Sequence, residues 1–232
     1  MIDIRLSDNL ELMSEMKDNT VDLIYCDILY GTGRKFKDYQ DLKPKREVIE
    51  EHYIPRIKEM HRILKDTGSV YLQMDTKISH WIRCVLDDVF GYEMFVNEII
   101  WKYGLGGSGK KEFAKKHDNI FFYSKSKNYN FNLQFEKATS NKMKGLNKKM
   151  IDVWDIPNIN NMAKERRDYN TQKPKVLIER IIKASSNEGD LVADFYAGSF
   201  TTAEVCKDLN RNFIGCDISE KAVAIGLERT KY

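Results

Sequence analysis

Short apolar segments alternate along the chain with longer segments in which apolar residues recur every three or four positions. The short segments predict strands, and the longer ones predict amphipathic helices. The predicted strands are residues 21–30, 69–74, 96–101, 119–124, 191–195 and 212–216. The predicted helices are residues 47–64, 77–90 and 175–185, followed by helices that begin at Thr201 and Ser219. This alternation predicts an α/β fold with a largely parallel sheet.

Two of these segments carry further signals. Residues 21–30 form an apolar run that only aspartates interrupt, as expected of a central strand buried on both faces. In residues 47–64, Pro55 is expected to begin a new first turn of helix.

Between residues 125 and 170 the periodic signal gives way to Lys, Asn and Ser. A chain of 232 residues fits one domain, so we predict a single domain over residues 1–232 with a basic, loop-rich insert at about 103–170.

Charge is distributed unevenly along the chain. Residues 101–150 hold 12 lysines, no arginine and three acidic residues, although the whole chain has a net charge of only +3. Aromatic residues lie among these lysines, and a basic surface of this kind favours a polyanion such as nucleic acid. Charge alone leaves a solvated lysine-rich loop as the alternative.

Composition excludes several classes of protein. No segment approaches the roughly 18 consecutive apolar residues of a membrane span, and the N-terminal residues lack the pattern of a signal peptide. The cysteines, which lack the paired spacing of zinc sites and disulfide scaffolds, are Cys26, Cys84, Cys206 and Cys216. We therefore predict a cytoplasmic protein with reduced, mostly buried thiols, no membrane association and no metal site.

Residues 191–219 have the pattern of a nucleoside-binding βαβ unit. A predicted strand ends at Asp194, small residues form a turn at 197–199, and a helix follows. Asp217 ends the next strand, where a carboxylate can accept hydrogen bonds from ribose hydroxyls. The dinucleotide motif G-x-G-x-x-G is absent, because Phe200 stands where a second glycine would be. A ligand with a ribose and no phosphate fits better, which favours S-adenosylmethionine; an ordinary strand–turn–helix corner is the alternative.

A second pattern follows the strand predicted at residues 21–30. That strand carries Asp27 and Tyr30 to the edge where ligands bind in open α/β sheets. An aspartate can accept a hydrogen bond from an exocyclic amine, and a tyrosine can stack on the base that carries this amine. Taken alone, such a pair is more often a cap and a core aromatic.

Together, the two patterns resemble the β-class amino-methyltransferases of DNA. In that family a catalytic D-P-P-Y motif precedes, and an F-x-G-x-G cofactor motif follows, a variable target-recognition region. The matching segments here are Asp27-Ile28-Leu29-Tyr30 and Tyr196-Ala197-Gly198-Ser199-Phe200, and Thr171-Gln172-Lys173-Pro174 matches the family's T-Q-K-P without change. Further matches lie at residues 7–11, 101–103 and 116–120. The resemblance covers nearly the whole chain, and the joint order of these motifs is specific.

The resemblance implies a doubly wound, Rossmann-like methyltransferase fold, with S-adenosylmethionine as cofactor and double-stranded DNA as substrate. It places the target amine against the Asp27 carboxylate and the Ile28 carbonyl, with Tyr30 stacked on an extruded base. The implied cofactor-binding residues are Asp8 and Asn9 at the adenine, Asp217 at the ribose, and Lys173, Asp194, Tyr196, Gly198 and Thr201 around the methionine end, with Ala197, Ser199 and Thr202 beside them. The residues expected on the DNA backbone are Lys102, Lys110, Lys111, Lys115 and Lys116.

Two departures from the family motifs bear on activity. Ile28 and Leu29 replace prolines that restrict the backbone, so a looser pocket is expected. Phe200 replaces the second glycine of the cofactor loop. If that position needs a positive φ, phenylalanine is strained there; otherwise its ring is expected to cover the cofactor.

Residues 104–110 also satisfy the phosphate-binding pattern G-x-x-x-x-G-K. However, Lys111 occupies the Ser/Thr position that would ligate magnesium, and no apolar helix follows, which disfavours a nucleotidase. We expect instead a glycine loop that closes over an extruded nucleotide.

The resemblance therefore implies a DNA adenine-N6 methyltransferase, because the cytosine-N4 branch of the family usually has Ser in place of Asp27. The implied reaction is direct transfer, which requires neither a metal nor a covalent enzyme intermediate. A catalytically silent DNA-binding protein that supports an active partner is the main alternative, and a cytosine-N4 enzyme is a further one. The resemblance leaves open a homodimer and a companion restriction endonuclease.

Overall fold

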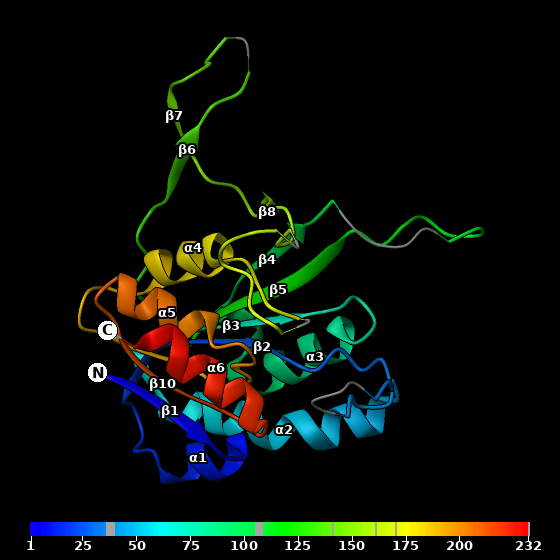
Figure 1. Cartoon of the computed structure of the whole chain (residues 1–232), viewed down its shortest axis with the longest axis vertical. Coiled ribbons are helices and arrows are strands. Elements are labelled where there is room, and N and C mark those ends of the chain that lie inside the picture. The colour runs from blue at the N-terminus through cyan, green and yellow to red at the C-terminus, as the bar shows by residue number, and fades with distance from the viewer. Residues whose placement is uncertain (36–39, 105–108, 141, 161, 170, 232) are drawn as a thin grey trace.

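The computed structural model describes residues 1–35, 40–104, 109–140, 142–160, 162–169 and 171–231. Within them, one sheet has the strand order β1-β10-β9-β2-β3-β5-β4-β8 (Figure 1). Its strands are β1 Ile2–Leu6, β2 Val21–Asp27, β3 Leu64–Met74, β4 Phe95–Lys102, β5 His117–Ser124, β8 Val153–Asp155, β9 Leu191–Asp194 and β10 Asn212–Asp217. Strand β5 runs antiparallel to β3 and β4, and the other neighbouring strands pair in parallel. The predicted mostly parallel sheet is confirmed.

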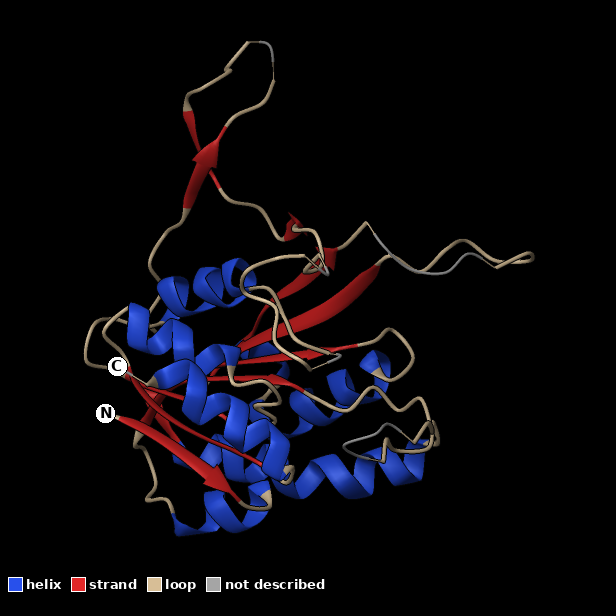
Figure 2. Ribbon diagram, viewed as in Figure 1, coloured by secondary structure: helices blue, strands red, loops and turns tan. Residues whose placement is uncertain are grey.

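Helices cover both faces of this sheet (Figure 2). They are α1 Asn9–Glu15, α2 Arg46–Ile63, α3 Ser79–Phe90, the short η1 Tyr92–Met94, α4 Lys175–Ser185, α5 Thr201–Asp208 and α6 Glu220–Thr230. On one face, α1, α2 and α3 close an apolar core that includes Ile57 and Leu86. On the other face, α4, α5 and α6 close a second core around Leu177 and Phe213. Two cores separated by one sheet confirm the doubly wound architecture.

Helix α2 continues through Pro55, so the fresh turn expected at this residue is wrong. A proline inside a helix removes one backbone hydrogen bond and costs about 3 kcal/mol. Ile49 and Tyr53 before the proline and Ile57 after it are all buried on the face that packs against the sheet. Packing of this continuous apolar face therefore holds both halves in a single helix.

The direction of winding reverses between β9 and β2, which pair in parallel in the middle of the sheet. From β9 the chain passes through α5 to β10, whereas from β2 it passes through α2 to β3 on the opposite side. Open α/β sheets bind ligands outside the carboxyl ends of the strands at such a point. Asp194 ends β9 and Asp27 ends β2. The fold thus brings the two predicted motifs to one crevice.

Several elements differ from the predictions. The strand predicted at residues 21–30 ends at Asp27; the Ile28 amide still donates to the Gln73 carbonyl of β3, and the chain then leaves the sheet. The sequence did not predict β1 or α1. It also missed β8 and the hairpin of β6 Phe135–Lys137 and β7 Asn147–Lys149, which projects from the body (Figure 1). Strands of three residues are too short to show a period.

The helices and the cysteines bear on membrane association and on the state of the thiols. Within the described residues, no helix has both the length and the apolar character that crossing a bilayer requires. All four cysteines carry free thiols; Cys84 is exposed, and the other three are buried.

Candidate active site

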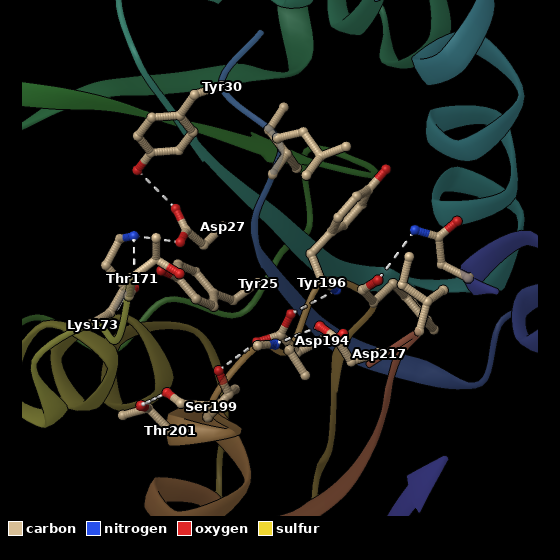
Figure 3. A pocket seen from close by; sticks show the side chains of 18 of the residues that line it. Tyr25, Asp27, Tyr30, Thr171, Lys173, Asp194, Tyr196, Ser199, Thr201 and Asp217 are labelled. Carbon is tan, nitrogen blue, oxygen red and sulfur yellow. Dashed lines mark hydrogen bonds and ion pairs between the residues drawn. The ribbon is translucent and has the colours of Figure 1, made fainter. Parts of the chain in front are cut away.

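A cavity of about 230 Å³ opens at the switch point between β9 and β2 (Figure 3). Every residue predicted to act in catalysis or in cofactor binding lines this cavity. Figure 3 shows Asp27, Tyr30 and Lys173 gathered at one end, with Asp194 and Asp217 away from them. We call these the catalytic end and the cofactor end. The structure brings the predicted residues together, while their individual roles remain predictions.

Asp194 ends β9 at the cofactor end and is only 2% exposed. Its Oδ2 accepts a hydrogen bond from Thr202 Oγ1 at 2.6 Å, and its Oδ1 accepts one from the Tyr196 amide at 3.1 Å. Burial outweighs both bonds and raises the pKa of Asp194 to about 7. A cationic ligand in the cavity would therefore stabilise the ionised form of this carboxyl.

Asp217 ends β10 and braces the small-residue turn. Its Oδ2 accepts a hydrogen bond from the Gly198 amide and its Oδ1 accepts one from the Ser219 amide, both at 2.9 Å. Gly198 has a φ of +49°, and an added Cβ would lie 3.2 Å from the Tyr169 ring. Only glycine combines this backbone conformation with so little space. Asp217 thus lines the cavity and also fixes the backbone of the turn.

Phe200 has a left-handed backbone with a φ of +54°, so this position does require a positive φ. A non-glycine residue loses roughly 1–2 kcal/mol in this conformation. The fully buried ring lies 6.3 Å from the Phe213 ring, and an added Cβ on Gly226 would lie 2.6 Å from it. Burial of a phenylalanine stabilises by about 1.5–3 kcal/mol, which offsets the strain. The ring belongs to the core and is not part of the cavity lining, so the alternative that it covers the cofactor is wrong.

Two residues of α2 that the sequence did not indicate also line the cavity, namely Arg56 and His52. Arg56 donates to Asn9 Oδ1 at 2.6 Å and to Asp8 Oδ2 at 3.3 Å, and so holds the predicted adenine contacts in place. His52 Nε2 lies 3.0 Å from the Tyr196 hydroxyl. Burial lowers the pKa of His52 to about 4, so its ring is neutral at physiological pH.

At the catalytic end, Asp27 forms an ion pair with Lys173, and its Oδ1 accepts a hydrogen bond from the Tyr30 hydroxyl at 2.8 Å. Burial raises the pKa of Asp27, and the Lys173 ammonium opposes this increase. Lys173 therefore stabilises the ionised carboxylate. Lys173 lines the cavity and its ammonium contacts Asp27, while its part in cofactor binding remains a prediction.

A buried polar network that was not predicted lies behind Asp27. The Tyr30 hydroxyl lies 2.6 Å from Asp118 Oδ2, and Gln73 Nε2 donates to the same oxygen at 2.9 Å. Gln73 Oε1 in turn accepts a hydrogen bond from the Tyr25 hydroxyl at 2.8 Å. These contacts join β2, β3 and β5, and they fix the orientation of the Tyr30 ring. No sequence pattern links residues of three separate strands in this way.

A second cavity of about 420 Å³ adjoins the first. Tyr30, Thr171 and Lys173 line both cavities. Tyr103 of the β4–β5 connection and Arg166 of the insert also line the second one. The Tyr30–Lys173 pair therefore separates two spaces that could receive two different ligands.

Comparison with known proteins identifies the family. Residues 21–228 match the family model described as DNA methylase, which covers N6 and N4 enzymes. The type II methyltransferase M.HpaI of Haemophilus parainfluenzae is 33% identical over 231 residues, which cover 96% of this chain and 72% of that protein. The chain belongs to the DNA methylase family. The DNA adenine methyltransferase YhdJ of Escherichia coli K12 is 32% identical over 244 residues, which cover 96% of this DNA methylase and 80% of YhdJ. The resemblance to amino-methyltransferases of the restriction-modification type is confirmed.

Solved structures agree with this fold. The cytosine-N4-specific PvuII DNA methyltransferase superposes with a TM-score of 0.78 at 17% identity, covering 100% of this DNA methylase and 86% of that chain. The M1.HpyAVI–SAM complex superposes with a TM-score of 0.69 at 20% identity, covering 100% of both chains. At these identities the comparison establishes a shared methyltransferase architecture.

The five lysines predicted on the DNA backbone lie outside the first cavity of this DNA methylase. Two of them are paired with acidic residues. Lys102 Nζ lies 2.6 Å from Asp155, and Lys115 Nζ lies 3.6 Å from Glu112. Both pairs are well exposed to solvent, so they are weak and can exchange an acidic partner for a phosphate.

The remaining lysines lie in residues 109–116 of the β4–β5 connection, which extends away from the sheet (Figure 1). Lys110 and Lys111 are exposed, Lys116 is half-buried, and Phe113 between them is 99% exposed. Residues 105–108 of the predicted glycine loop lie outside the described residues. The described part is thus a basic projection with one aromatic side chain fully in solvent.

Proposed function

We propose that this DNA methylase transfers a methyl group from S-adenosylmethionine to the N6 amine of an adenine in double-stranded DNA. The observation that carries the proposal is the Asp27 carboxylate beside Tyr30, at the boundary between two cavities. A carboxylate is a strong acceptor for an amine N–H, and the aromatic ring can stack on the base that bears it. The aspartate at the first motif position favours adenine, and the relative YhdJ is itself named an adenine methyltransferase.

The residues of the cofactor end fit S-adenosylmethionine. Asp217 lies at the tip of β10, where a carboxylate can accept hydrogen bonds from ribose hydroxyls. Asp194, with a pKa of about 7, provides a negative charge for the ammonium group of the methionine end. Arg56 is bound to Asp8 and Asn9, so its charge is already balanced there. When bound, S-adenosylmethionine supplies an electrophilic methyl group on a positively charged sulfur, which suits this acidic lining.

Asp27 and Tyr30 act on the target base. An extruded adenine would occupy the second cavity, where Tyr30 and Tyr103 offer aromatic faces. Lys173 keeps Asp27 ionised, and the ionised carboxylate accepts a hydrogen bond from the amine as its nitrogen gains positive charge. A preorganised partner of this kind contributes about 3 kcal/mol to transition-state stabilisation.

Basic segments outside the cavities would hold the duplex. Residues 109–116 and the β6–β7 hairpin both project from the body in Figure 1. The hairpin carries Lys137, Lys148 and Lys149, and a two-stranded ribbon has dimensions that the major groove admits. Lysines neutralise phosphates without reading sequence, so site preference would come from other groups of the insert.

The test identifies the methylated base. The purified protein is incubated with genomic DNA and S-adenosylmethionine labelled in its methyl group, and the DNA is digested to nucleosides. We expect the label in N6-methyladenine. Label in N4-methylcytosine would refute the base assignment, and binding of both ligands without any label would support a catalytically silent DNA-binding protein.

A homodimer, a companion restriction endonuclease and the assignment of residues 1–232 to a single domain remain predictions. Sequencing of modified bases in cells that express the protein would locate the recognition site. A nuclease that cleaves the same unmodified site would be the companion.

A further inference from the structure

The turn that carries the Ile28 carbonyl and Tyr30 lacks the two prolines of the family motif. Prolines would restrict this backbone through their rings. Ile28 and Leu29 impose no such restriction, so another part of the molecule must hold the turn in place if the carbonyl and the ring are to meet a base with fixed geometry.

Neighbouring elements bind the backbone of this turn from two sides. The Ile28 amide donates to the Gln73 carbonyl of β3 at 3.0 Å, a bond that proline could not make. The Leu29 carbonyl accepts a hydrogen bond from the Tyr53 hydroxyl of α2 at 3.0 Å. Tyr53 is fully buried, so its hydroxyl has a fixed position.

Asp41 binds the next part of the turn. Its Oδ1 accepts hydrogen bonds from the Gly31 amide at 3.1 Å and the Leu42 amide at 2.8 Å. Its Oδ2 accepts hydrogen bonds from the Thr32 amide at 2.7 Å and the Thr32 hydroxyl at 2.5 Å. A carboxylate has about four acceptor sites, and these four donors use them. Asp41 is 3% exposed and lines the first cavity, but its two oxygens are taken up by donors of the turn, so its role is to hold the turn.

The turn is also closely packed. Gly31 has a φ of +62°, and an added Cβ would lie 2.6 Å from Ile78 Cγ2 of the neighbouring segment. The backbone approaches this side chain as closely as a glycine permits. A change in the turn would therefore move Tyr30, which follows directly on Leu29 and precedes Gly31.

We propose that Asp41 and Tyr53 are positioning residues that replace the two prolines of the family motif and hold the Ile28 carbonyl and Tyr30 ready for the target base. This inference rests on the proposed methyl transfer and adds two residues to it. Their contribution is preorganisation, because the turn is ordered before the base arrives and no ordering is required at the moment of reaction.

The test compares Asp41→Asn and Tyr53→Phe with a matched control, Asp190→Asn. Asparagine keeps the shape of Asp41 but turns an amide donor toward the backbone N–H groups, and phenylalanine keeps the buried ring while removing the bond to Leu29. Asp190 also braces a turn, by accepting a hydrogen bond from the Asn187 amide at 2.7 Å, and it does not line the first cavity. The readouts are kcat for methyl transfer into DNA irrespective of the base, S-adenosylmethionine affinity by calorimetry, and the thermal midpoint.

We expect Asp41→Asn to lower kcat by about 10- to 100-fold, the scale for a displacement of about 1 Å in a catalytic group. Tyr53→Phe should lower it several-fold. Cofactor affinity should stay within about threefold, and Asp190→Asn should match the wild type in kcat. Equal turnover in Asp41→Asn and the control, or a parallel loss of kcat and cofactor affinity, would overturn the proposal. Absence of transfer by the wild-type protein would instead contradict the proposed function.

Rescue separates a positioning role from general damage. Among the hydrogen bonds of the described residues, none involves the Leu29 amide, so Leu29→Pro removes none of them. It restores one proline of the family motif. We expect the double variant Asp41→Asn/Leu29→Pro to turn over at least threefold faster than Asp41→Asn alone. If the double variant is no faster than Asp41→Asn, the contacts of Asp41 do not replace a proline of the family motif, and the proposal is overturned.

Discussion

The two ends of the cavity are built in different ways. At the cofactor end, the Asp194 and Asp217 carboxylates accept hydrogen bonds from backbone amides of their own βαβ unit, among them the Tyr196 amide and the Gly198 amide, which lies 19 residues from Asp217. At the catalytic end, Asp27 depends on Lys173, 146 residues away, and Tyr30 on Asp118, 88 residues away. The two carboxylates of the cofactor end are thus held within one βαβ unit, whereas the catalytic end exists only when β2, β3, β5 and the segment before α4 have assembled.

This difference predicts that substitutions at the two ends of the cavity affect cofactor binding and methyl transfer separately. Substitutions at the cofactor end should weaken S-adenosylmethionine binding and leave the geometry around the target base intact. Substitutions at the catalytic end should slow transfer without changing cofactor affinity, because the Asp194 and Asp217 carboxylates are held by hydrogen bonds within their own βαβ unit. A single variant that changes both properties equally would contradict the division.

The largest effect is expected for Asp27→Ala. Loss of a group aimed at developing charge costs about 3 kcal/mol or more, so kcat should fall by at least about 100-fold. Cofactor affinity should stay within about threefold, since the other end of the cavity is intact. Single-turnover transfer of labelled methyl groups and calorimetry measure the two quantities. Transfer at the wild-type rate would exclude Asp27 from catalysis.

The same difference explains what could be predicted from the sequence. Asp194, residues 197–199 and Asp217 lie within one short stretch, so their spacing alone indicates the cofactor end. The partners of Asp27 and Tyr30 come from distant segments, and Gln73 resembles any other strand residue until β2 and β3 are paired. Their contacts depend on sheet register, which apolar periodicity does not determine.

The helices and strands show the same contrast between what local spacing predicts and what depends on tertiary contacts. Helix α4 has the predicted bounds, because its apolar residues recur with helical spacing against one core. The strands within the predicted insert were not predicted, since β6, β7 and β8 have only three residues each and show no period. Where tertiary packing overrides local preference, as at Pro55 in α2 and at Phe200, the sequence could only indicate that a conflict existed.

Asp217→Ala should weaken S-adenosylmethionine binding by about 1.5–3 kcal/mol, the range for a charged hydrogen-bond acceptor. At saturating cofactor, kcat should be largely retained. Because Asp217 also caps backbone amides, Asp75→Ala is the control; Asp75 accepts a hydrogen bond from the Lys77 amide at 2.7 Å and lines neither cavity. If calorimetry shows the wild-type affinity for S-adenosylmethionine in Asp217→Ala, Asp217 supports the backbone of the turn and does not bind the cofactor.

The basic projection is predicted to act on DNA affinity alone. Each neutralised phosphate adds roughly 0.9 to the slope of log affinity against log salt, so replacing the four lysines with Gln should flatten that slope by up to about 3–4. The residues to replace are Lys110, Lys111, Lys115 and Lys116. The control replaces lysines elsewhere on the surface, namely Lys17, Lys43, Lys58 and Lys231. Equal slopes in the two variants would mean that the duplex binds another face.

Asp194 makes cofactor binding depend on pH. Because its pKa is raised to about 7, the carboxyl is protonated below that pH and loses its attraction for a cationic ligand. S-adenosylmethionine affinity should therefore fall as pH decreases from 8 to 6, by at most about tenfold per unit below 7. The raised pKa also means that the folded state binds an extra proton between about pH 4 and 7, so this group's contribution to stability is lost as pH rises through that window. Asp194→Asn should bind weakly at every pH; a persistent pH dependence in this variant would assign the titration to another group.

The smallest effect is expected for Lys173→Met, which removes the charge that opposes the raised pKa of Asp27. Without the ammonium that pKa should rise further, and the acidic limb of the pH profile of kcat should move to higher pH, since transfer needs the ionised carboxylate. At alkaline pH, where Asp27 is ionised in either protein, the difference should narrow. Lys173→Arg is the control, because it retains the positive charge beside Asp27 and should keep the limb near its wild-type position. If both variants have the wild-type profile, Lys173 is a structural partner of Asp27 with no influence on its ionisation during transfer.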